Sequence, residues 1–542
     1  MTSTSAKSIE LECDYLVVGA GTACLSFVDS LLTHHSNATV ILIDRNAIPG
    51  GHWTTAYPFV RLHQPACFYG VNSMPLGKNR TSSGDEVFDI SDRSSSQEIC
   101  LYYQKVVETF EATGRVQAFF NTEYTKESDE SNNTIQHILR TPDGVYTVKC
   151  QKIVCCETKV VVPSMRDVPF PVDPSITIKP VNYIPEAVES GNYSKYMVIG
   201  AGKTGTDAIV QLLRSGIDQE QITWIISRDV WYAMRDGMWG SDGKRFYKRR
   251  AEMLDILLEA DSLRDAVLGL EREGKFAKLD PNGPYPAVFK GPTIDSSELE
   301  LARSVKNRVR MGRVTSITSE KVLLDKGSIS ISGTDTLVVD CMAENLYGYA
   351  DFEMGFKFFN KDHIRLGPVT HTFNPSLTSA LVGYLEGTFL DDEVKNGFLY
   401  FPCGIEFHSV RPESFLLSVV SQMYTMSALS NYRPAMKFLL QARTFQESPK
   451  HHGGMVNFLW GAFGPVKLVK KQDLLMEKIK SGGYSDLNNI FEEWPNAISL
   501  DSKTIKAALR TNQPKYKKKK KAFPTVADQS SNSETRAALK VN

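Results

Sequence analysis

The fold is decided by the stretch Tyr15-Leu-Val-Val-Gly-Ala-Gly-Thr22, an apolar run that ends in two closely spaced glycines. Val40-Ile-Leu-Ile43 is a second apolar run, and residues 22–33 between the two have helical spacing. This pattern predicts a β-α-β unit with two buried parallel strands. Gly19 and Gly21 allow a tight turn and a close approach of backbone to a ligand, and the free N–H groups of the following helix attract a phosphate.

Asp44 ends the second predicted strand, about 20 residues after the glycine turn. A carboxylate at this position accepts hydrogen bonds from the two ribose hydroxyls of a dinucleotide. Cys24 stands where the G-x-G-x-x-G pattern has its third glycine. Because that position faces the strand at close range, a thiol requires the helix to stand slightly further out. We predict a dinucleotide site here, and a β-turn-α unit without a ligand is the alternative.

A second β-α-β unit is predicted from Tyr196-Met-Val-Ile199 to Ile222-Thr-Trp-Ile-Ile226. Between these runs Gly200, Gly202 and Gly205 complete the full G-x-G-x-x-G pattern and lead into a helical stretch. The agreement of strand, turn, helix and strand makes this a stronger signal than the glycines alone. The chain therefore carries two candidate dinucleotide sites.

The residues that end the second unit indicate which nucleotide it binds. Ser227 and Arg228 place a hydroxyl beside a guanidinium, and that pair suits the 2′-phosphate of NADP. Asp229 follows directly, although an acid suits the unsubstituted ribose of NAD. We expect NADPH in preference to NADH, and an ordinary surface ion pair for Arg228 is the alternative.

Composition and charge narrow the class of protein. The chain has 542 residues, of which 42% are hydrophobic, and its 62 basic side chains equal its 62 acidic ones. This balance argues against a general nucleic-acid or anionic-membrane binder. No apolar run is long enough to span a membrane, and the polar N-terminus does not resemble a signal peptide. We expect a cytoplasmic protein, while the basic run Lys517–Lys521 leaves nuclear or membrane-surface association open.

The cysteines and histidines suggest neither a metal site nor a disulfide centre. The nine cysteines are scattered and none forms C-x-x-C, which argues against a disulfide scaffold, a zinc ribbon and a dithiol reductase. His451-His452 has no carboxylate at helical spacing, so we predict no metal ligands.

With both turns in place, the chain resembles the flavin-containing monooxygenase-like branch of the FAD/NAD(P)-dependent oxidoreductases. Gly50-Gly51-His52-Trp53 resembles the G-G-x-W segment of that family, and Gly200 to Asp207 resembles its second G-x-G-x-S-G-x-D motif. The resemblance implies FAD at the first turn and NADPH at the second. It assigns FAD to Gly19, Gly21, Cys24, Asp44, Gly51, His52 and Trp53, and NADPH to Gly200, Gly202, Gly205, Ser227 and Arg228.

Two segments depart from the family pattern. The F-x-G-x-x-x-H signature is absent before the second turn, where Ile178–Ile184 stands, and Asp340-Cys-Met-Ala343 replaces an A-T-G segment. The resemblance implies a monooxygenase that uses NADPH and O₂ on a small organic substrate. A reductase or dehydrogenase without oxygen insertion is the alternative that the departures keep open, and a non-catalytic nucleotide-binding interaction protein is another.

The segment Tyr57-Pro-Phe-Val-Arg-Leu-His-Gln-Pro65 follows G-G-H-W directly, so a flavin-binding fold would carry it past the isoalloxazine ring. We predict His63 and Gln64 as hydrogen-bonding groups beside the ring, with Arg61 as a third candidate. The alternative is that these side chains bond only the backbone of their own loop.

The expected fold is α/β, with two Rossmann-like dinucleotide-binding domains, the NADP domain inserted into a discontinuous FAD domain, and a mostly helical C-terminal region. A homo-oligomer is an open possibility. The predicted boundaries are 1–187 and 335–400 for the two parts of the FAD-binding domain, 188–334 for the NAD(P)-binding domain, 401–510 for the helical region and 511–542 for a disordered basic and polar tail.

Overall fold

The structure is a computed structural model that describes residues 9–77, 89, 91–129, 134–157, 161–239, 243–289, 291, 293–331, 335–343, 356–367, 374–399, 412–446, 448, 470–479, 481–486 and 500–510. The predicted tail 511–542 with Lys517–Lys521, and the pair His451-His452, lie outside them.

The first sheet has seven strands in the order β3-β2-β1-β6-β5-β4, with β18 beside β6. Its parallel part holds the strands of the first predicted unit, and an antiparallel pair extends it beyond β6. The strands are β1 (Ile9–Val18), β2 (Val40–Ile43), β3 (Val116–Phe119), β4 (Glu123–Asp129), β5 (Thr134–Thr141), β6 (Gly144–Cys156) and β18 (His363–Leu366).

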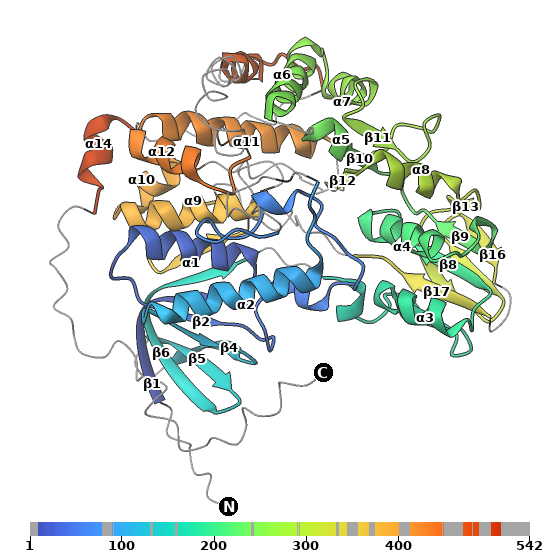
Figure 1. Cartoon of the computed structure of the whole chain (residues 1–542), viewed down its shortest axis with the longest axis horizontal. Coiled ribbons are helices and arrows are strands. Elements are labelled where there is room, and N and C mark those ends of the chain that lie inside the picture. Colours follow the sequence, from blue (N-terminus) through green and yellow to red (C-terminus); the bar gives the residue numbers. More distant parts are fainter. Residues whose placement is uncertain are drawn as a thin grey trace, which may run out of the picture.

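Three helices cover this sheet on the side of the first glycine turn: α1 (Thr22–His34), α2 (Ser96–Ala112) and α9 (Pro375–Thr388) (Figure 1). Helices α1 and α9 pack closely at Gly383, where an added Cβ would lie 2.3 Å from the carbonyl oxygen of Phe27. Residues 22 and 24–32 of α1 are therefore almost wholly buried, and the helix is held rigidly over the sheet.

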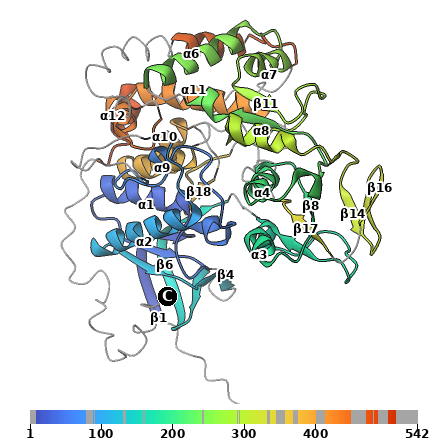
Figure 2. The same ribbon diagram turned by 45° about the vertical axis from the view of Figure 1, so that its right-hand side comes forward.

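The second sheet is parallel throughout and has the order β13-β9-β8-β17-β7. Its strands are β7 (Ile178–Pro180), β8 (Lys195–Ile199), β9 (Ile222–Ile225), β13 (Arg308–Val309) and β17 (Thr336–Asp340), and its helices include α3 (Ile184–Ser190), α4 (Lys203–Arg214) and α8 (Ser296–Ser304). Figure 2 shows β8 and β17 of this sheet beside α3 and α4. Because β18 rejoins the first sheet only after β17, the second domain is an insertion into the first, which confirms the predicted fold.

The second sheet extends beyond the predicted range 188–334 at both ends. β7 precedes that range and pairs with β17, while β17 follows it and pairs with β8. β7 (Ile-Lys-Pro) is not an apolar run, and the sheet membership of both strands depends on residues more than 100 positions away, so local pattern alone does not assign them.

Two small antiparallel or mixed sheets and a helical layer complete the second domain. The sheets contain β10 (Trp231–Met234), β11 (Phe276–Lys278) and β12 (Thr293–Ile294), and β14 (Val314–Ile317), β15 (Lys321–Leu324) and β16 (Gly327–Ser330). The helices are α5 (Arg235–Met238), α6 (Gly243–Glu259) and α7 (Leu263–Arg272). α6 and α7 are separate helices, and Ser262 caps the second one.

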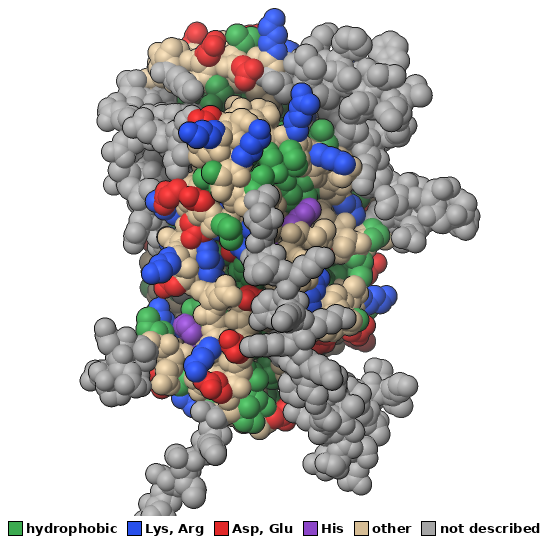
Figure 3. Space-filling model, turned by 90° about the vertical axis from the view of Figure 1, so that its left-hand side faces the viewer, with side chains coloured by type: hydrophobic (Ala, Val, Ile, Leu, Met, Phe, Trp, Pro, Cys, Tyr) green, Lys and Arg blue, Asp and Glu red, His purple; other side chains and the backbone are tan. Residues whose placement is uncertain are grey.

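The C-terminal region is helical where the structure describes it. It contains α10 (Asp392–Gly397), α11 (Glu413–Ser430), α12 (Arg433–Gln441), a helix at 470–479 and α14 (Ser502–Ala507). No helix among the described residues has the length and apolar character needed to cross a membrane. On the face shown in Figure 3, basic and acidic side chains are interspersed rather than gathered by sign.

Candidate active site

The first glycine turn joins β1 to α1. Gly19 has a φ of 105°, in the region that favours glycine, and its N–H donates to the carbonyl of Ile43 at 2.8 Å. Gly21 is the N-cap of α1, with no side-chain cap and no acid in the first turn of the helix. The free N–H groups of that turn are therefore available to a phosphate.

Gly51 approaches this turn from η1 (Gly51–Thr55), a short 3-10 helix that follows β2. Its φ is 59°, and a Cβ on it would lie 3.0 Å from the Cα of Gly21. Gly50 ties the two segments together, since its N–H donates to the carbonyl of Ala20 at 2.9 Å. The G-G-H-W segment therefore lies against the first turn.

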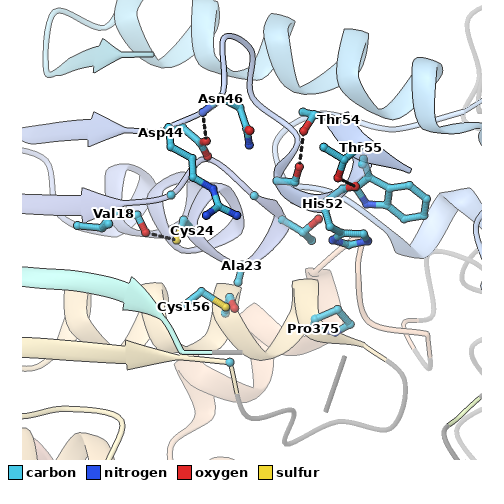
Figure 4. A pocket seen from close by; sticks show the side chains of 18 of the residues that line it. Val18, Ala23, Cys24, Asp44, Asn46, His52, Thr54, Thr55, Cys156 and Pro375 are labelled. Atoms are coloured by element: carbon cyan, nitrogen blue, oxygen red, sulfur yellow. Dashed lines mark hydrogen bonds between the residues drawn. The ribbon is translucent and has the colours of Figure 1, made fainter. Parts of the chain in front are cut away.

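Asp44 is buried at the end of β2, beside the turn (Figure 4). Its Oδ2 accepts from the N–H of Ala20 at 2.6 Å, and its Oδ1 accepts from the N–H of Asn46 at 2.8 Å. These bonds fix the carboxylate, and each oxygen keeps a further lone pair for a ribose hydroxyl. Cys24 lies below, with its Sγ 3.6 Å from the carbonyl oxygen of Val18.

A buried hydroxyl network fixes the same region from the other side. Trp53 Nε1 donates to the Tyr69 hydroxyl at 2.7 Å, that hydroxyl bonds Thr22 Oγ1, and Tyr103 donates to Thr22 Oγ1 at 2.8 Å. Thr22 is the first residue of α1. The network therefore holds η1 against the start of α1. No sequence motif indicated this role of Tyr69 and Tyr103.

A cavity of about 1010 Å³ opens along these elements. Figure 4 shows Asp44 and Asn46 on one side of it, His52 and Pro375 on the other, and Ala23 and Cys24 between them. Its charged lining residues are Asp44, Arg45 and Glu123. The further lining residues include Gly19, Gly21, Thr22, Trp53, Leu62, His63, Gln64, Tyr69, Thr122, Tyr124, Thr125, Cys156, Trp239, Gly291, Thr293 and Ser379.

Two of the three predicted ring-side residues lie in this cavity. His63 and Gln64 line it, and Gln64 Nε2 also donates to the carbonyl of Phe68 at 3.4 Å. Arg61 is absent from the described lining: its side chain is 57% exposed and donates to the carbonyl of Arg93 at 3.1 Å. Arg61 is therefore turned to solvent, whereas the next three residues, Leu62, His63 and Gln64, line the cavity.

Burial holds the pKa of His63 well below its usual value, and the cations Lys203, Arg235 and Arg93 lower it further, as does the neighbouring His52 imidazole. Burial alone lowers the pKa of His52 to about 4. Both imidazoles are therefore neutral at physiological pH, and each offers one N–H donor and one ring-nitrogen acceptor.

The second glycine turn joins β8 to α4 with closer packing than the first. Gly200 has a φ of 126°, and a Cβ on Gly205 would lie 2.0 Å from the carbonyl oxygen of Gly200. A Cβ on Gly202, by contrast, would meet nothing within 4 Å. The space in front of Gly202 is therefore open, and no side chain caps α4.

Ser227 and Arg228 are exposed just past the end of β9. Asp229 is turned to Arg310, whose Nε and Nη2 donate to it at 2.9 and 3.1 Å. This bidentate pair neutralises the acid that would otherwise oppose a phosphate. Partial burial and the neighbouring Arg313 lower the pKa of Arg228, so a second cation lies close to it.

Sequence reasoning missed the contribution of the second domain to the first cavity. Trp239 follows α5 and Thr293 begins β12, yet both line the cavity beside the first-domain residues. Arg235, at the start of α5, donates to Thr293 O and Asp295 Oδ2, both at 2.9 Å. No local motif marks such residues, because only the packing of the two domains brings them together.

The eight cysteines in the described part of the chain are free thiols. Burial raises the pKa of Cys24 and Cys155, and neighbouring thiols and acids raise it further, so these groups are poor nucleophiles. Within the described ranges, no three His, Cys, Asp or Glu side chains are grouped as a metal site requires.

No protein-family model matches the chain. Over 400 residues it is 36% identical to the uncharacterized protein Rv2000 of Mycobacterium tuberculosis strain H37Rv, and equally to MT2056 of strain CDC 1551 and Mb2023 of Mycobacterium bovis. Each alignment covers 73% of this chain and 71% of the relative.

Solved structures with a similar arrangement are more distant. A polycyclic ketone monooxygenase from Thermothelomyces thermophila has a TM-score of 0.47 at 10% identity, with 89% of this chain and 90% of that chain covered. A steroid monooxygenase bound to NADP has 0.46 at 14% (87% and 98% covered), and a bacillithiol disulfide reductase from Staphylococcus aureus has 0.41 at 12% (69% and 97%). Likeness at this distance transfers neither a cofactor nor a reaction.

Proposed function

We propose that this chain, which belongs to the same family as the mycobacterial proteins Rv2000, MT2056 and Mb2023, is an FAD-dependent oxidoreductase that takes its electrons from NADPH. The observation that carries the proposal is the continuous cavity of about 1010 Å³ along the first glycine turn. It reaches from the ribose-binding acid Asp44, past the uncapped start of α1, to His63 and Gln64.

The residues present fit FAD in the first cavity. Gly21 and Gly51 bring two backbones together at the start of α1 with no side chain between them, which leaves the N–H groups open to a pyrophosphate. Asp44 keeps its remaining lone pairs for ribose hydroxyls. Thr122 and Tyr124, which follow β3, line the cavity together with Asp44, so we assign the adenosine half to them.

The second turn fits NADPH by the same criteria. The space before Gly202 is open, and the start of α4 is uncapped. Arg228 is exposed and Arg313 is near it, while Asp229 is already paired with Arg310. These features support recognition of a 2′-phosphate by charge-assisted hydrogen bonds.

When bound, FAD would provide the redox chemistry, which is the uptake of hydride from NADPH and the transfer of its electrons to an acceptor. The chain supplies orientation and charge. Neutral His63 and the Gln64 amide are the hydrogen-bonding groups we assign to the ring. Asp44, Arg45 and Glu123 are the charged residues in the described lining, and all three belong to the end assigned to adenosine.

We further propose that the reaction is a monooxygenation of a small organic substrate. Leu62 and Trp239 are buried, and with Pro375 they give the His63 side of the cavity an apolar wall. An apolar wall excludes water from a reactive cofactor, which favours oxygen transfer over the release of peroxide.

The test is NADPH consumption by FAD-loaded protein with and without O₂. Beyond the one equivalent that reduces the bound flavin, a monooxygenase consumes NADPH only when O₂ is present, and it incorporates oxygen into an organic product. Equal consumption in the absence of O₂ with an organic acceptor would identify a reductase or dehydrogenase. A protein that retains no FAD would contradict the proposal as a whole and favour a non-catalytic interaction protein.

A further inference from the structure

The loop of residues 57–64, which carries His63 and Gln64, is attached to the second domain by a buried tyrosine. The hydroxyl of Tyr57 donates to Asp207 Oδ2 at 2.6 Å. Tyr57 is only 6% exposed, and burial together with Asp207 raises its pKa well above the usual value. Tyr57 therefore stays protonated and keeps donating to Asp207.

Asp207 belongs at the same time to the second glycine turn. It lies in the second turn of α4, and its Oδ1 accepts from Lys203, the residue directly after Gly202. The side chains of Lys203 and Asp207 are 10% and 12% exposed. One carboxylate thus connects the start of α4, where a pyrophosphate would bind, with the loop that lines the first cavity.

A second contact holds the other end of the loop. Thr293 Oγ1 donates to the carbonyl oxygen of His63 at 2.7 Å, and Thr293 is 1% exposed. Since Thr293 lies in β12 of the second domain, the backbone at His63 is fixed by a group from outside its own domain.

The segment of residues 91–95, which runs beside the loop, is also held to the second domain. The N–H of Leu62 donates to the carbonyl of Ser94 at 3.0 Å. The adjacent Arg93 bonds Glu298 of α8 at 3.3 Å and lies 3.7 Å from Asp295. All the contacts described for this loop across the domain boundary are partly or wholly buried, where hydrogen bonds are stronger than in water.

We propose that Tyr57 and Thr293 are positioning residues, through which the second glycine turn and its domain set the placement of His63 and Gln64 in the first cavity. The roles of His63 and Gln64 at a flavin rest on the proposed function, whereas the coupling between the two segments does not. Tyr57 is not among the described lining residues of the first cavity, and Thr293, which does line it, acts here through its hydrogen bond to the His63 carbonyl. They act by holding the loop.

The first experiment is hydrogen–deuterium exchange on the full cofactor-free chain. Tyr57→Phe and Thr293→Val should speed the exchange of the Val60 and Leu62 amides about tenfold, because each variant removes one buried hydrogen bond. Tyr484→Phe is the matched control, since it removes a buried tyrosine hydroxyl that donates to the distant Leu257 carbonyl. If both test variants exchange within about twofold of the wild type, as the control should, positioning by these residues is excluded.

The second experiment adds NADP⁺ as the probe. In the wild type it should slow exchange both at residues 200–206 and at residues 57–64. In Tyr57→Phe the protection at 200–206 should persist and the protection at 57–64 should be lost. Equal protection of the loop in both proteins would overturn the coupling. If NADP⁺ protects neither segment in the wild type, the proposed nucleotide site at residues 200–206 is wrong, and so is its coupling to the loop of residues 57–64. The exchange measured without cofactor would then still test whether Tyr57 and Thr293 position the loop.

A third readout separates positioning from a loss of folding. In FAD-loaded protein, Tyr57→Phe should lower kcat and leave the KM for NADPH within about twofold. In a His63→Ala background the same change should have little further effect, because residues that act through one another are non-additive. Fully additive effects would contradict the proposal.

Discussion

Gly51 lies so close to Gly21 that a Cβ added to it would stand 3.0 Å from the Gly21 Cα. The two glycines belong to segments on either side of β2, and their contact forms a backbone surface without side chains at the start of α1. A phosphate needs such a surface to reach the free N–H groups of the helix. The contact gives the G-G-H-W segment a physical reason for its place after the first unit.

Replacement of Gly51 by alanine should therefore weaken FAD binding strongly. The new methyl group would displace the turn and also strain a backbone at φ 59°. We expect a loss in FAD affinity of tenfold or more, measured by titration of the cofactor-free protein. Gly114→Ala is the matched control, since Gly114 has φ 69° but nothing within 4 Å of its added Cβ. Similar losses in both variants would show that backbone strain, and not the contact, matters.

The residues at the third position of the two glycine turns, Cys24 in the first and Gly205 in the second, should differ in how strongly a change to alanine affects nucleotide binding. Gly205→Ala would place a methyl group 2.0 Å from the carbonyl oxygen of Gly200, so we expect it to abolish NADPH binding or to destabilise the second domain. Cys24→Ala only removes a buried thiol, at a cost of roughly 1–2 kcal/mol in the free energy of unfolding, and should keep FAD. Isothermal titration with each nucleotide checks both. An unaffected NADPH affinity in Gly205→Ala would refute the close packing of α4.

Arg228→Ala should raise the KM for NADPH at least about tenfold, because it removes a charge-assisted hydrogen bond to the 2′-phosphate. The KM for NADH should stay within about twofold, since NADH lacks that phosphate. Arg140→Ala is a suitable control, because Arg140 is a half-exposed arginine on the first sheet paired with Glu127. Equal effects on both nucleotides would mean that Arg228 does not recognise the 2′-phosphate.

His52 and His63 should make the cofactor-free protein less stable in acid. The pKa of each is lowered in the folded chain, that of His52 to about 4. Between about pH 6.5 and pH 4 the unfolded chain therefore binds more protons, so stability is complete above this window and falls as the pH decreases through it. The slope should be at most about 1.4 kcal/mol per pH unit for each histidine.

The measurement is urea unfolding across that pH range. His52→Gln should flatten the acid side of the stability profile and leave the protein's stability at pH 8 little changed. A profile with the same slope in wild type and variant would contradict the burial of His52.

Sequence reasoning predicts best what is local. The strand at Val40–Ile43 and the helix that begins at Thr22 are found as expected, because apolar spacing and a glycine turn determine both within a few residues. The inserted arrangement of the second domain also follows from the order of the two units along the chain. The sheet membership of β7 and β17 does not, since their pairing partners are distant in sequence.

The residues of the candidate site also fall into two groups, those that local sequence predicts and those that only the packed structure reveals. The glycines, Asp44, His63 and Gln64 are visible as motifs or their neighbours. Trp239 and Thr293 enter the first cavity only because the second domain packs against it, and the loop that turns Arg61 to solvent carries no local signal of its direction. Residues recruited across a domain boundary need the packed structure to be found.

The central claim is that FAD binds along the first glycine turn, and the most direct measurement is flavin absorbance after reconstitution and gel filtration. We predict that the wild-type chain emerges yellow with a stoichiometry near one flavin per chain, and that Gly21→Glu, folded but with a carboxylate in the pyrophosphate position, emerges colourless. A colourless wild type, or a Gly21→Glu variant that keeps its flavin, would contradict the account.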